Sequence, residues 1–236
     1  MRLQSFAAGA TAIVFGASGG IGGAVADALD AEPHVMRVFR LGRQGTPVLD
    51  IQNEDTIAAA AEHVSRLSEP PRLLFDATGV LHGEGLSPEK SWKHLDPEAM
   101  AEAFAINATG PALLIKHFMP LMPRSGKAVF ATLSARVGSI GDNRFGGWYA
   151  YRASKAALNQ IVRTAAVELG RRRPEAVCAA LHPGTVDTDL TAPFHKTGLT
   201  VRTPAQAADR LLDVVDRMTP AHSGGFYDYA FEPIPW

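Results

Sequence analysis

Tyr151 and Lys155 are the two residues of this chain whose types and spacing most directly suggest chemistry. They stand four apart in Tyr151-Arg152-Ala153-Ser154-Lys155, at the start of a segment without glycine or proline until Gly170. Such a segment predicts a helix, in which residues i and i+4 lie on one face. A free tyrosine titrates near about 10, and one positive charge at about 4 Å supplies a few kcal/mol toward lowering that pKa. The pair predicts a proton-transfer tyrosine whose pKa Lys155 lowers, although chance places the same pair on many surface helices.

A glycine-rich segment near the start of the chain predicts a binding site for a dinucleotide. An apolar strand over 11–15 leads into Gly16-Ala17-Ser18-Gly19-Gly20-Ile21-Gly22-Gly23, which opens a helix. Glycines let the backbone approach a pyrophosphate, and the helix N-terminus presents free N–H groups and a positive dipole end. No lysine follows, so the segment is not a P-loop, and a glycine-rich turn without a ligand is the alternative.

Three arginines near the expected end of the second strand favour NADP(H) over NAD(H). An enzyme that prefers NAD usually carries an acid there for the ribose hydroxyl, whereas arginine suits a 2′-phosphate. No acid occurs between Glu32 and Asp50, while Arg37, Arg40 and Arg43 gather in that interval. Arg43 is the first choice and Arg40 the second. The alternative is that all three are exposed charges at a strand end.

Apolar, β-branched segments alternate with longer helical patterns, which predicts a single domain over 1–236 with a Rossmann-type α/β/α fold. We expect a seven-stranded parallel sheet, with strands over 11–15, 35–41, 47–51, 72–77, 127–133, 177–182 and 225–229. Helices are expected over 20–29, 54–68, 97–122, 149–170 and 204–218, two of them opened by Asp96-Pro97 and Thr203-Pro204. Two long loops, 79–95 and 183–202, follow strands. Ligands of open α/β sheets bind at such carboxyl ends.

The composition argues against several classes of function. The 23 basic and 24 acidic residues nearly cancel, so no overall field favours nucleic acid or a membrane surface. The single cysteine, Cys178, excludes an intrachain disulfide and a thiolate metal site, and we expect no metal. Because no signal-peptide pattern or membrane-length apolar run is present, we expect a cytoplasmic protein with a small-molecule substrate.

The glycine spacing and the Tyr151-x3-Lys155 motif together resemble the classical short-chain dehydrogenase/reductase family, over nearly the whole chain. The resemblance implies that Asn107 completes the active site with Tyr151, Lys155 and a serine. It also implies that Asp50 contacts the adenine and that Pro183-Gly184-Thr185-Val186-Asp187-Thr188 holds the nicotinamide carboxamide and the phosphates. The cofactor-binding residues expected on this basis are Gly16, Ser18, Gly20, Ile21, Gly22, Arg43, Asp50, Gly79, Asn107, Tyr151, Lys155, Pro183, Gly184, Val186 and Thr188.

Two segments depart from the family pattern. Asp76-Ala77-Thr78-Gly79 stands where the family usually has Asn-Asn-Ala-Gly. In Leu133-Ser134-Ala135-Arg136-Val137-Gly138-Ser139, the usual position of the catalytic serine holds Ala135. We expect Ser134 to supply the hydroxyl, with Ser139 as the alternative. A chain in which neither serine reaches the site would bind cofactor but turn over slowly.

A narrower resemblance is to the bacterial C-factor-like branch, near the sniffer-type carbonyl reductases. It is carried by Gly79-Val80-Leu81-His82, by the residues 146–159, by 182–190 and by Pro235-Trp236. It implies an NADP(H)-dependent oxidoreductase that interconverts a carbonyl and a secondary alcohol, as a homodimer or homotetramer. The alternatives are a weakly catalytic or non-catalytic cofactor-binding signalling protein and an epimerase or dehydratase of the extended family.

Three aromatic residues near the expected site have two possible roles. Phe145, Trp148 and Phe194 either line an apolar substrate pocket or pack in the core. The loop 187–202 is expected to fold over the substrate.

Overall fold

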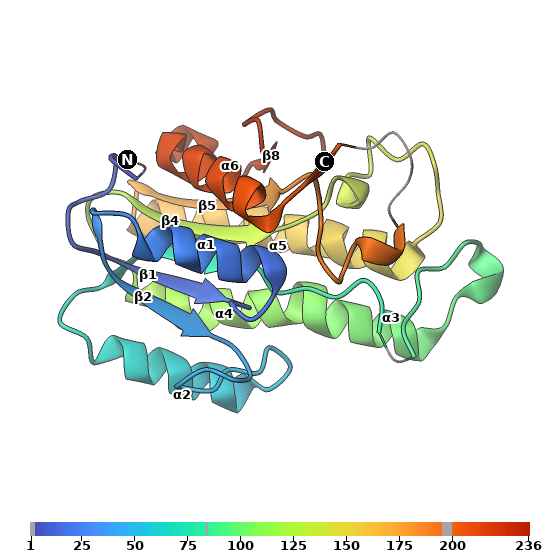
Figure 1. Cartoon of the computed structure of the whole chain (residues 1–236), viewed down its shortest axis with the longest axis horizontal. Coiled ribbons are helices and arrows are strands. Elements are labelled where there is room, and N and C mark those ends of the chain that lie inside the picture. Colours follow the sequence, from blue (N-terminus) through green and yellow to red (C-terminus); the bar gives the residue numbers. More distant parts are fainter. Residues whose placement is uncertain (1–2, 84, 195–199) are drawn as a thin grey trace.

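Six parallel strands form the central sheet in the order β2-β1-β3-β4-β5-β8 (Figure 1). The computed structural model describes residues 3–83, 85–194 and 200–236. The strands are β1 Ala10–Phe15, β2 Val35–Leu41, β3 Pro71–Asp76, β4 Ala128–Leu133, β5 Ala176–His182 and β8 Phe226–Asp228. The chain turns to opposite sides of β1 for β2 and β3, and a ligand crevice opens beyond such a switch point.

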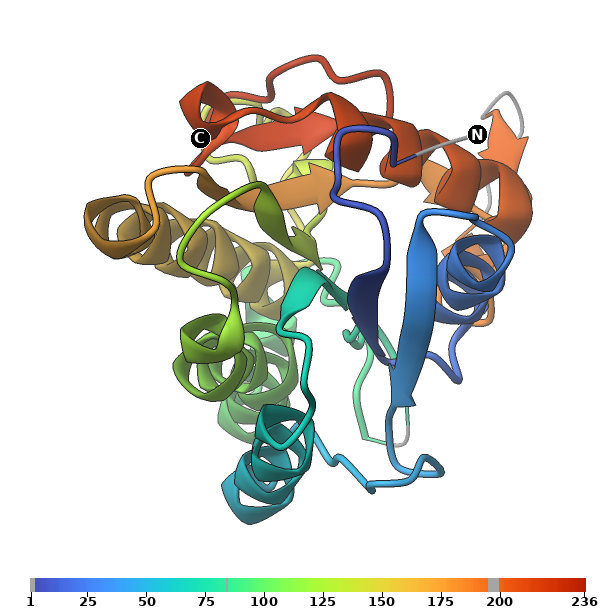
Figure 2. The ribbon, with the colours of Figure 1, turned by 90° about the vertical axis from the view of Figure 1, so that its left-hand side faces the viewer.

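Helices cover both faces of this sheet, as Figure 2 shows along the strands. One face carries α1 (Gly20–Asp30) and α6 (Pro204–Arg217), and the other carries α2 (Glu54–Ser65), α4 (Gly110–Phe118) and α5 (Tyr149–Arg172). Each face has its own apolar core, because side chains alternate along a strand. Ile13 and Phe15 pack with α2, α4 and α5, while Ala12 and Val14 pack with α1 and α6. The predicted three-layer Rossmann-type fold is confirmed.

The sequence signals for two helix starts are confirmed in detail. Helix α3 spans Pro97–Phe104, and the Asp96 side chain accepts a hydrogen bond from the Ala99 N–H at 2.8 Å. Helix α6 begins with a reciprocal capping box between Thr203 and Gln206. Each cap satisfies N–H groups that the first helical turn leaves without partners.

The predicted strand over 47–51 is wrong, so the main sheet has six strands instead of seven. Only Val48 forms a bridge there, with Gly42. Pro47 has no N–H to offer a ladder, and the Asp50 N–H donates to the Thr56 hydroxyl instead of to a strand. Two short strands, β6 (Thr185–Val186) and β7 (Val201–Arg202), form a second small sheet that the sequence did not predict.

The predicted helix over 97–122 is interrupted by a π-helical turn at Ala105–Thr109 between α3 and α4. The physical reason lies in Gly110 and Pro111, which follow the turn. Pro111 has no N–H to donate to the carbonyl of Asn107 four residues earlier, as a regular helix would require. π-helical turns inside helices often lie at functional sites.

Among the described residues, no helix is both long and apolar enough to span a membrane. Cys178 is fully buried, and burial raises the pKa of its thiol to about 12.

Candidate active site

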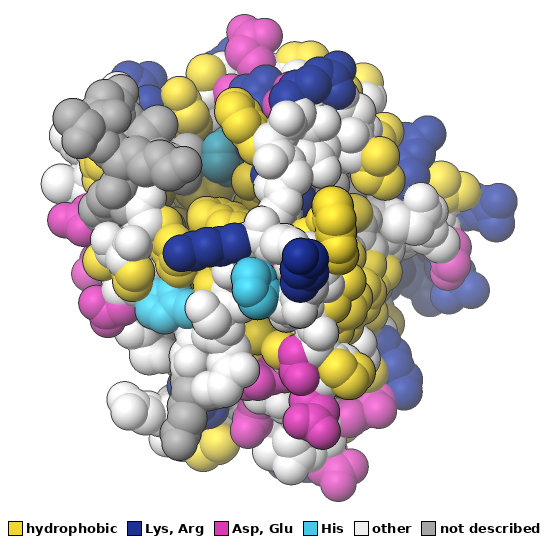
Figure 3. All heavy atoms as spheres, turned by 90° about the vertical axis from the view of Figure 1, so that its right-hand side faces the viewer, with side chains coloured by type: hydrophobic (Ala, Val, Ile, Leu, Met, Phe, Trp, Pro, Cys, Tyr) yellow, Lys and Arg dark blue, Asp and Glu magenta, His cyan; other side chains and the backbone are white. Residues whose placement is uncertain are grey.

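A cavity of about 570 Å³ opens beyond the carboxyl ends of the strands. Figure 3 shows this end of the molecule hollowed, with apolar side chains in its depth. Its lining comes from the glycine loop, the end of β3, the segment after β4, the start of α5 and the loop after β5. The topology thus brings together most of the residues that the sequence singled out.

The glycine loop and the N-terminus of α1 form one end of this cavity. The N-cap residue Gly19 has no side chain to occupy the first-turn N–H groups, and the first turn carries no acidic residue. A Cβ on Gly22 would lie 2.3 Å from the Gly16 carbonyl oxygen, and a Cβ on Gly20 would lie 2.8 Å from Thr188 Cγ2. These contacts require glycine at both positions. The open helix end offers N–H groups and a positive dipole, so the residues present fit a dinucleotide pyrophosphate.

Tyr151 and Lys155 both line the cavity from the first turns of α5. Lys155 is only 3% exposed, and its Nζ lies 5.9 Å from the centre of the Tyr151 ring. The expected net lowering of the Tyr151 pKa is not found in this structure, since burial raises that pKa to about 12. The Lys155 ammonium donates to the Leu133 carbonyl oxygen at 2.8 Å.

Lys155 is itself perturbed by its surroundings. Burial lowers its pKa to about 8, and the nearby Asp76 carboxylate partly opposes that shift. Asp76 is fully buried at the end of β3, where it accepts hydrogen bonds from the hydroxyls of Thr132 and Thr78, both at 2.6 Å. Burial raises the pKa of Asp76 while these donors oppose the rise. Asp76 thus ties β3 to β4 and places a carboxylate near the lysine.

Asn107 lies in the π-helical turn and is fully buried beside Gly79. Its amide oxygen accepts from the Val80 N–H at 2.8 Å, and its Nδ2 donates to the Val80 oxygen at 2.9 Å and to Ser154 Oγ at 3.1 Å. A Cβ on Gly79 would lie 3.2 Å from Asn107 Oδ1 and 3.4 Å from Lys155 Nζ. The structure therefore brings Asn107, Gly79 and Lys155 together, with the side-chain amide of Asn107 engaged by protein groups.

The two candidate serines differ in position. Ser134 lines the cavity, is 3% exposed, and donates its hydroxyl proton to Asn159 Oδ1 at 2.7 Å. Ser139 does not line the cavity, and its hydroxyl donates to the Pro235 carbonyl oxygen. Ala135 also lines the cavity, where it presents a methyl group. The structure brings Ser134 to the site and leaves Ser139 outside it.

Arg43 and Asp50, two residues expected to bind the cofactor, do not line the cavity. Arg43 is exposed in the turn after β2, and Ser18 Oγ lies 3.9 Å from where a Cβ of the neighbouring Gly42 would stand. Arg40, the second choice for a 2′-phosphate, is engaged by Asp27 at 2.8 Å and Asp30 at 2.5 Å on α1. Those exposed ion pairs hold the Arg40 guanidinium at α1.

Asp50 is half-buried after the turn that follows β2. One carboxylate oxygen accepts from the Gln52 N–H at 3.0 Å.

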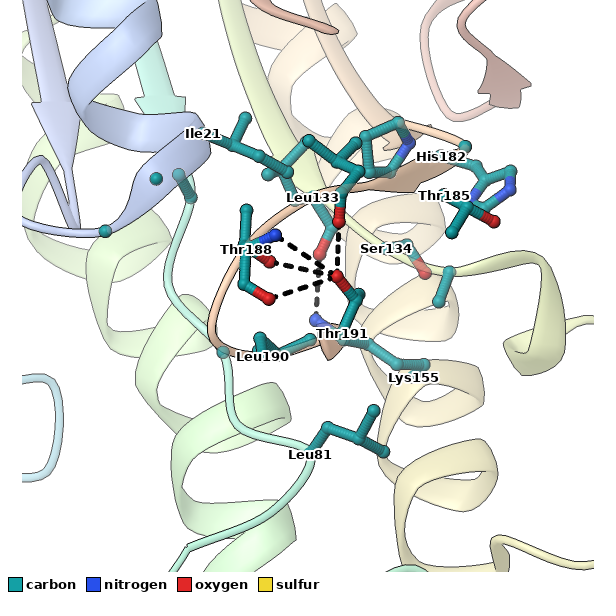
Figure 4. Close-up of a pocket in the computed structure, with 18 of the residues that line it drawn as sticks. Ile21, Leu81, Leu133, Ser134, Lys155, His182, Thr185, Thr188, Leu190 and Thr191 are labelled. Atoms are coloured by element: carbon teal, nitrogen blue, oxygen red, sulfur yellow. Dashed lines mark hydrogen bonds between the residues drawn. The ribbon is translucent and has the colours of Figure 1, made fainter. Parts of the chain in front are cut away.

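The loop after β5 also lines the cavity and approaches the glycine loop where Thr188 meets Gly20. Pro183, Gly184, Val186 and Thr188 all line it, as predicted for cofactor-binding positions. The Thr191 hydroxyl donates to the Val186 oxygen and also meets the Thr188 hydroxyl at 3.2 Å (Figure 4). These bonds fix the loop in a tight turn. Residues 195–199 of the predicted substrate loop lie outside the described residues.

Two of the three aromatic residues singled out by sequence reach the cavity. Trp148 and Phe194 line it with ring centroids 5.2 Å apart, and Trp148 lies 6.3 Å from the Tyr151 ring. Phe145 is 94% exposed and does not line the cavity. Trp148 and Phe194 belong to the candidate substrate region, and Phe145 does not.

Two residues near Tyr151 were missed by sequence reasoning. Glu89, in the long loop after β3, is 5% exposed, and its carboxylate accepts from the Ala150 N–H at 3.1 and 3.2 Å. Arg152 donates to the carbonyl oxygens of Gly147 and Val137. No local sequence signal marks Glu89, because it acts across 61 residues of chain. The position of Arg152 inside Tyr151-x3-Lys155 was visible but had no assigned role.

The profile of a family described as Enoyl-(Acyl carrier protein) reductase matches residues 16–213 of this chain. The chain is 40% identical to C-signal of Myxococcus xanthus over 144 residues, covering 60% of this chain and 81% of that protein. It is 33% identical to 1-hydroxy-2-glutathionyl-2-methyl-3-butene dehydrogenase of Rhodococcus sp. strain AD45 over 180 residues, covering 76% and 75% of the two chains.

Two solved structures have the same fold over nearly their whole length. The NADPH-bound carbonyl reductase from chicken fatty liver matches with a TM-score of 0.85 and 25% identity, covering 98% of this chain and 95% of that chain. The carbonyl reductase Sniffer of D. melanogaster matches with a TM-score of 0.83 and 22% identity, covering 97% and 100%. The latter likeness concerns the fold.

Proposed function

Because this chain belongs to the short-chain dehydrogenase/reductase family of NAD(P)-dependent oxidoreductases, we propose that it interconverts a carbonyl compound and its alcohol with NADP(H): a ketone and a secondary alcohol, or an aldehyde and a primary alcohol. The observation that carries the proposal is the placement of Tyr151 and Lys155 in one cavity with the glycine loop and the loop after β5. A dinucleotide held at the N-terminus of α1 would extend along this cavity toward the phenol.

NADPH, when bound, supplies a hydride to the carbonyl carbon. Tyr151 holds the proton that the carbonyl oxygen takes up, and its raised pKa keeps the phenol protonated at neutral pH. Lys155 contributes a positive charge beneath the phenol, which favours the tyrosinate left after proton transfer. Ser134 lines the cavity close to Lys155. Its hydroxyl leaves Asn159 Oδ1 and donates a hydrogen bond to the substrate carbonyl oxygen instead.

Asn107 would supply a route for the proton that restores Tyr151. Its side-chain amide is hydrogen-bonded to Val80 and Ser154. A water molecule bound by Asn107 would therefore donate a hydrogen bond to its backbone carbonyl oxygen. Pro111 leaves that carbonyl without its usual helical donor. The π-helical turn thus favours a bound water next to Lys155.

The preference for NADP(H) rests on Arg43. It is exposed in the turn after β2, beside Gly42 and Ser18, while Arg40 is held by two aspartates of α1. A guanidinium at that place recognises a 2′-phosphate through charge-assisted hydrogen bonds. The NADPH named with the chicken carbonyl reductase supports the same preference.

A second candidate is a cofactor-binding signalling protein with little turnover. The similarity to C-signal favours it, as does Ala135 at the position where the family usually has its catalytic serine. In this case NADPH binds to the same site, but the alcohol or carbonyl chemistry contributes nothing to the biological role.

The experiment that separates the two candidates is NADPH oxidation measured with a panel of aldehydes, ketones and quinones. The oxidoreductase proposal expects saturable NADPH consumption with a matching amount of alcohol product on at least one of them. Tight NADPH binding in calorimetry without turnover on any member of the panel would overturn it in favour of the signalling candidate.

A further inference from the structure

The entrance to α5 has an unusual backbone conformation next to Tyr151. Three consecutive residues before the helix, Gly146, Gly147 and Trp148, have positive φ angles of 63°, 68° and 55°. A side chain as large as tryptophan rarely adopts this left-handed conformation, which costs on the order of 1 kcal/mol or more. The surrounding protein has to hold Trp148 in this state.

Two side chains and one backbone group hold it. The Glu89 carbonyl oxygen accepts the Trp148 N–H at 2.6 Å, and the Glu89 carboxylate accepts the Ala150 N–H. From within α5, Arg152 donates to the carbonyl oxygens of Gly147 at 2.9 Å and Gly146 at 3.2 Å. Glu89 is buried and far away in sequence, so the fixation depends on tertiary structure.

The hydrogen bonds that hold the backbone at Trp148 also determine where its indole ring lies. Trp148 is half-buried, meets Tyr151 and Phe194 edge to face, and lines the cavity with both of them. Phe194 comes from the loop after β5, and its ring lies 5.5 Å from that of His82. The indole of Trp148 therefore stands next to the candidate proton donor, and the phenyl ring of Phe194 packs against the indole.

The rest of this part of the cavity is also apolar. Leu81, Val137 and Leu190 line it. Of the charged side chains that line the cavity among the described residues, Arg136 is paired with Asp142 at 2.6 Å and Lys155 lies beneath Tyr151. Asp189, the remaining one, is exposed. Such a lining offers dispersion and edge-to-face contacts to an apolar substrate group, with few unpaired charges for a charged one.

We propose that Trp148, held by Glu89 and Arg152, determines substrate specificity, and that the site selects carbonyl compounds bearing a flat apolar group such as an aryl ring. The inference rests on the proposed oxidoreductase function. Trp148 provides the surface against which the flat group packs, while Tyr151 addresses the carbonyl oxygen. Glu89 and Arg152 are positioning residues, because they touch the backbone around Trp148 and not the substrate.

The first test compares benzaldehyde with propanal as substrates of the NADPH-loaded protein. Trp148→Ala is expected to lower kcat/KM for benzaldehyde about tenfold through KM, and to change the value for propanal less than about twofold. Phe145→Ala removes an exposed aromatic residue three positions away and is expected to leave both values unchanged. Equal losses for the two aldehydes, or no loss for either, would overturn the assignment of Trp148.

The second test concerns Glu89. Glu89→Gln keeps an oxygen that accepts the Ala150 N–H, so it is expected to retain the parent preference for benzaldehyde. Glu89→Ala is expected to reproduce the selective rise in KM, with kcat and NADPH affinity preserved. Glu98→Ala, at an exposed position in α3, serves as the control. A loss of kcat for both aldehydes in Glu89→Ala, with the preference intact, would show a merely structural role and contradict the proposal.

A binding measurement separates this inference from the proposed function. Binding of benzyl alcohol to the NADP⁺-loaded protein is measured by saturation-transfer NMR for the parent and for Trp148→Ala. If the parent reduces no aldehyde but binds benzyl alcohol, and Trp148→Ala does not bind it, the proposed function fails and the specificity assignment stands. If both aldehydes are reduced and benzyl alcohol binds equally to both proteins, the assignment fails and the oxidoreductase stands.

Discussion

The pH dependence of NADPH use gives the sharpest prediction about the active site, because Lys155 has to be positively charged for its proposed role. Burial lowers the pKa of Lys155 to about 8, and that of Tyr151 is raised to about 12. Between these values the phenol keeps its proton while the lysine loses its charge. The alkaline side of the profile should therefore report Lys155.

The size of the effect follows from the titration of one group with this pKa. The protonated fraction of Lys155 falls about tenfold between about pH 7 and pH 9. The value of kcat/KM for NADPH reports groups of the free protein, so it should fall by the same factor over this range. The assay is steady-state NADPH oxidation at saturating aldehyde, in buffers of constant ionic strength.

Two variants assign the titration to the correct lysine. Lys155→Arg keeps a positive charge at all these pH values, so a lower but pH-independent activity is expected. Lys127 also has a pKa lowered to about 8 by burial, but its ammonium contacts Ser5 and the carbonyl oxygens of Asp216 and Met218, outside the cavity lining. Lys127→Gln should leave the alkaline decline in place. A parent profile that stays flat to pH 9, or a decline that disappears with Lys127, would refute the reasoning.

Three further substitutions test the cofactor and serine assignments. Gly22→Ala should weaken NADPH binding in calorimetry by about tenfold or more, because its Cβ would lie 2.3 Å from the Gly16 oxygen. Gly170→Ala, which has open space around its Cβ, should leave NADPH binding unchanged. Arg43→Ala should lower affinity for NADPH about tenfold and leave that for NADH unchanged, and an equal loss for both would contradict the 2′-phosphate role. Ser134→Ala should lower kcat about tenfold. This is less than is usual for an oxyanion donor, because the Ser134 hydroxyl must first leave Asn159 Oδ1. An unchanged kcat would show that Ser134 takes no part in the mechanism.

The parts of the fold that local chemistry dictates were predictable from the sequence. Asp96 and Thr203 precede prolines, and each caps a helix that begins at the predicted residue. The glycine loop at Gly16–Gly22 was predictable because its backbone segments approach one another too closely for side chains. The interruption at Ala105–Thr109 was missed, although Pro111 was a visible signal against an unbroken helix.

The parts that depend on long-range contacts were not predictable. The Glu89 carboxylate accepts a hydrogen bond from Ala150 in α5, 61 residues later in the sequence. Ser134 donates to Asn159, 25 residues later. The pKa of Tyr151 is a second example, because spacing showed a nearby lysine but not the burial that raises the pKa of the phenol. Helical spacing gives proximity of side chains, whereas a pKa depends on everything that surrounds them.

The most direct test of the central claim is the rate of aldehyde reduction by Tyr151→Phe under conditions where NADPH binding is measured in the same sample. The account predicts that this variant binds NADPH with the parent affinity and loses activity by at least about a hundredfold, since only the proton donor is removed. A Tyr151→Phe protein that reduces the aldehyde at the parent rate would contradict the claim that Tyr151 supplies the proton.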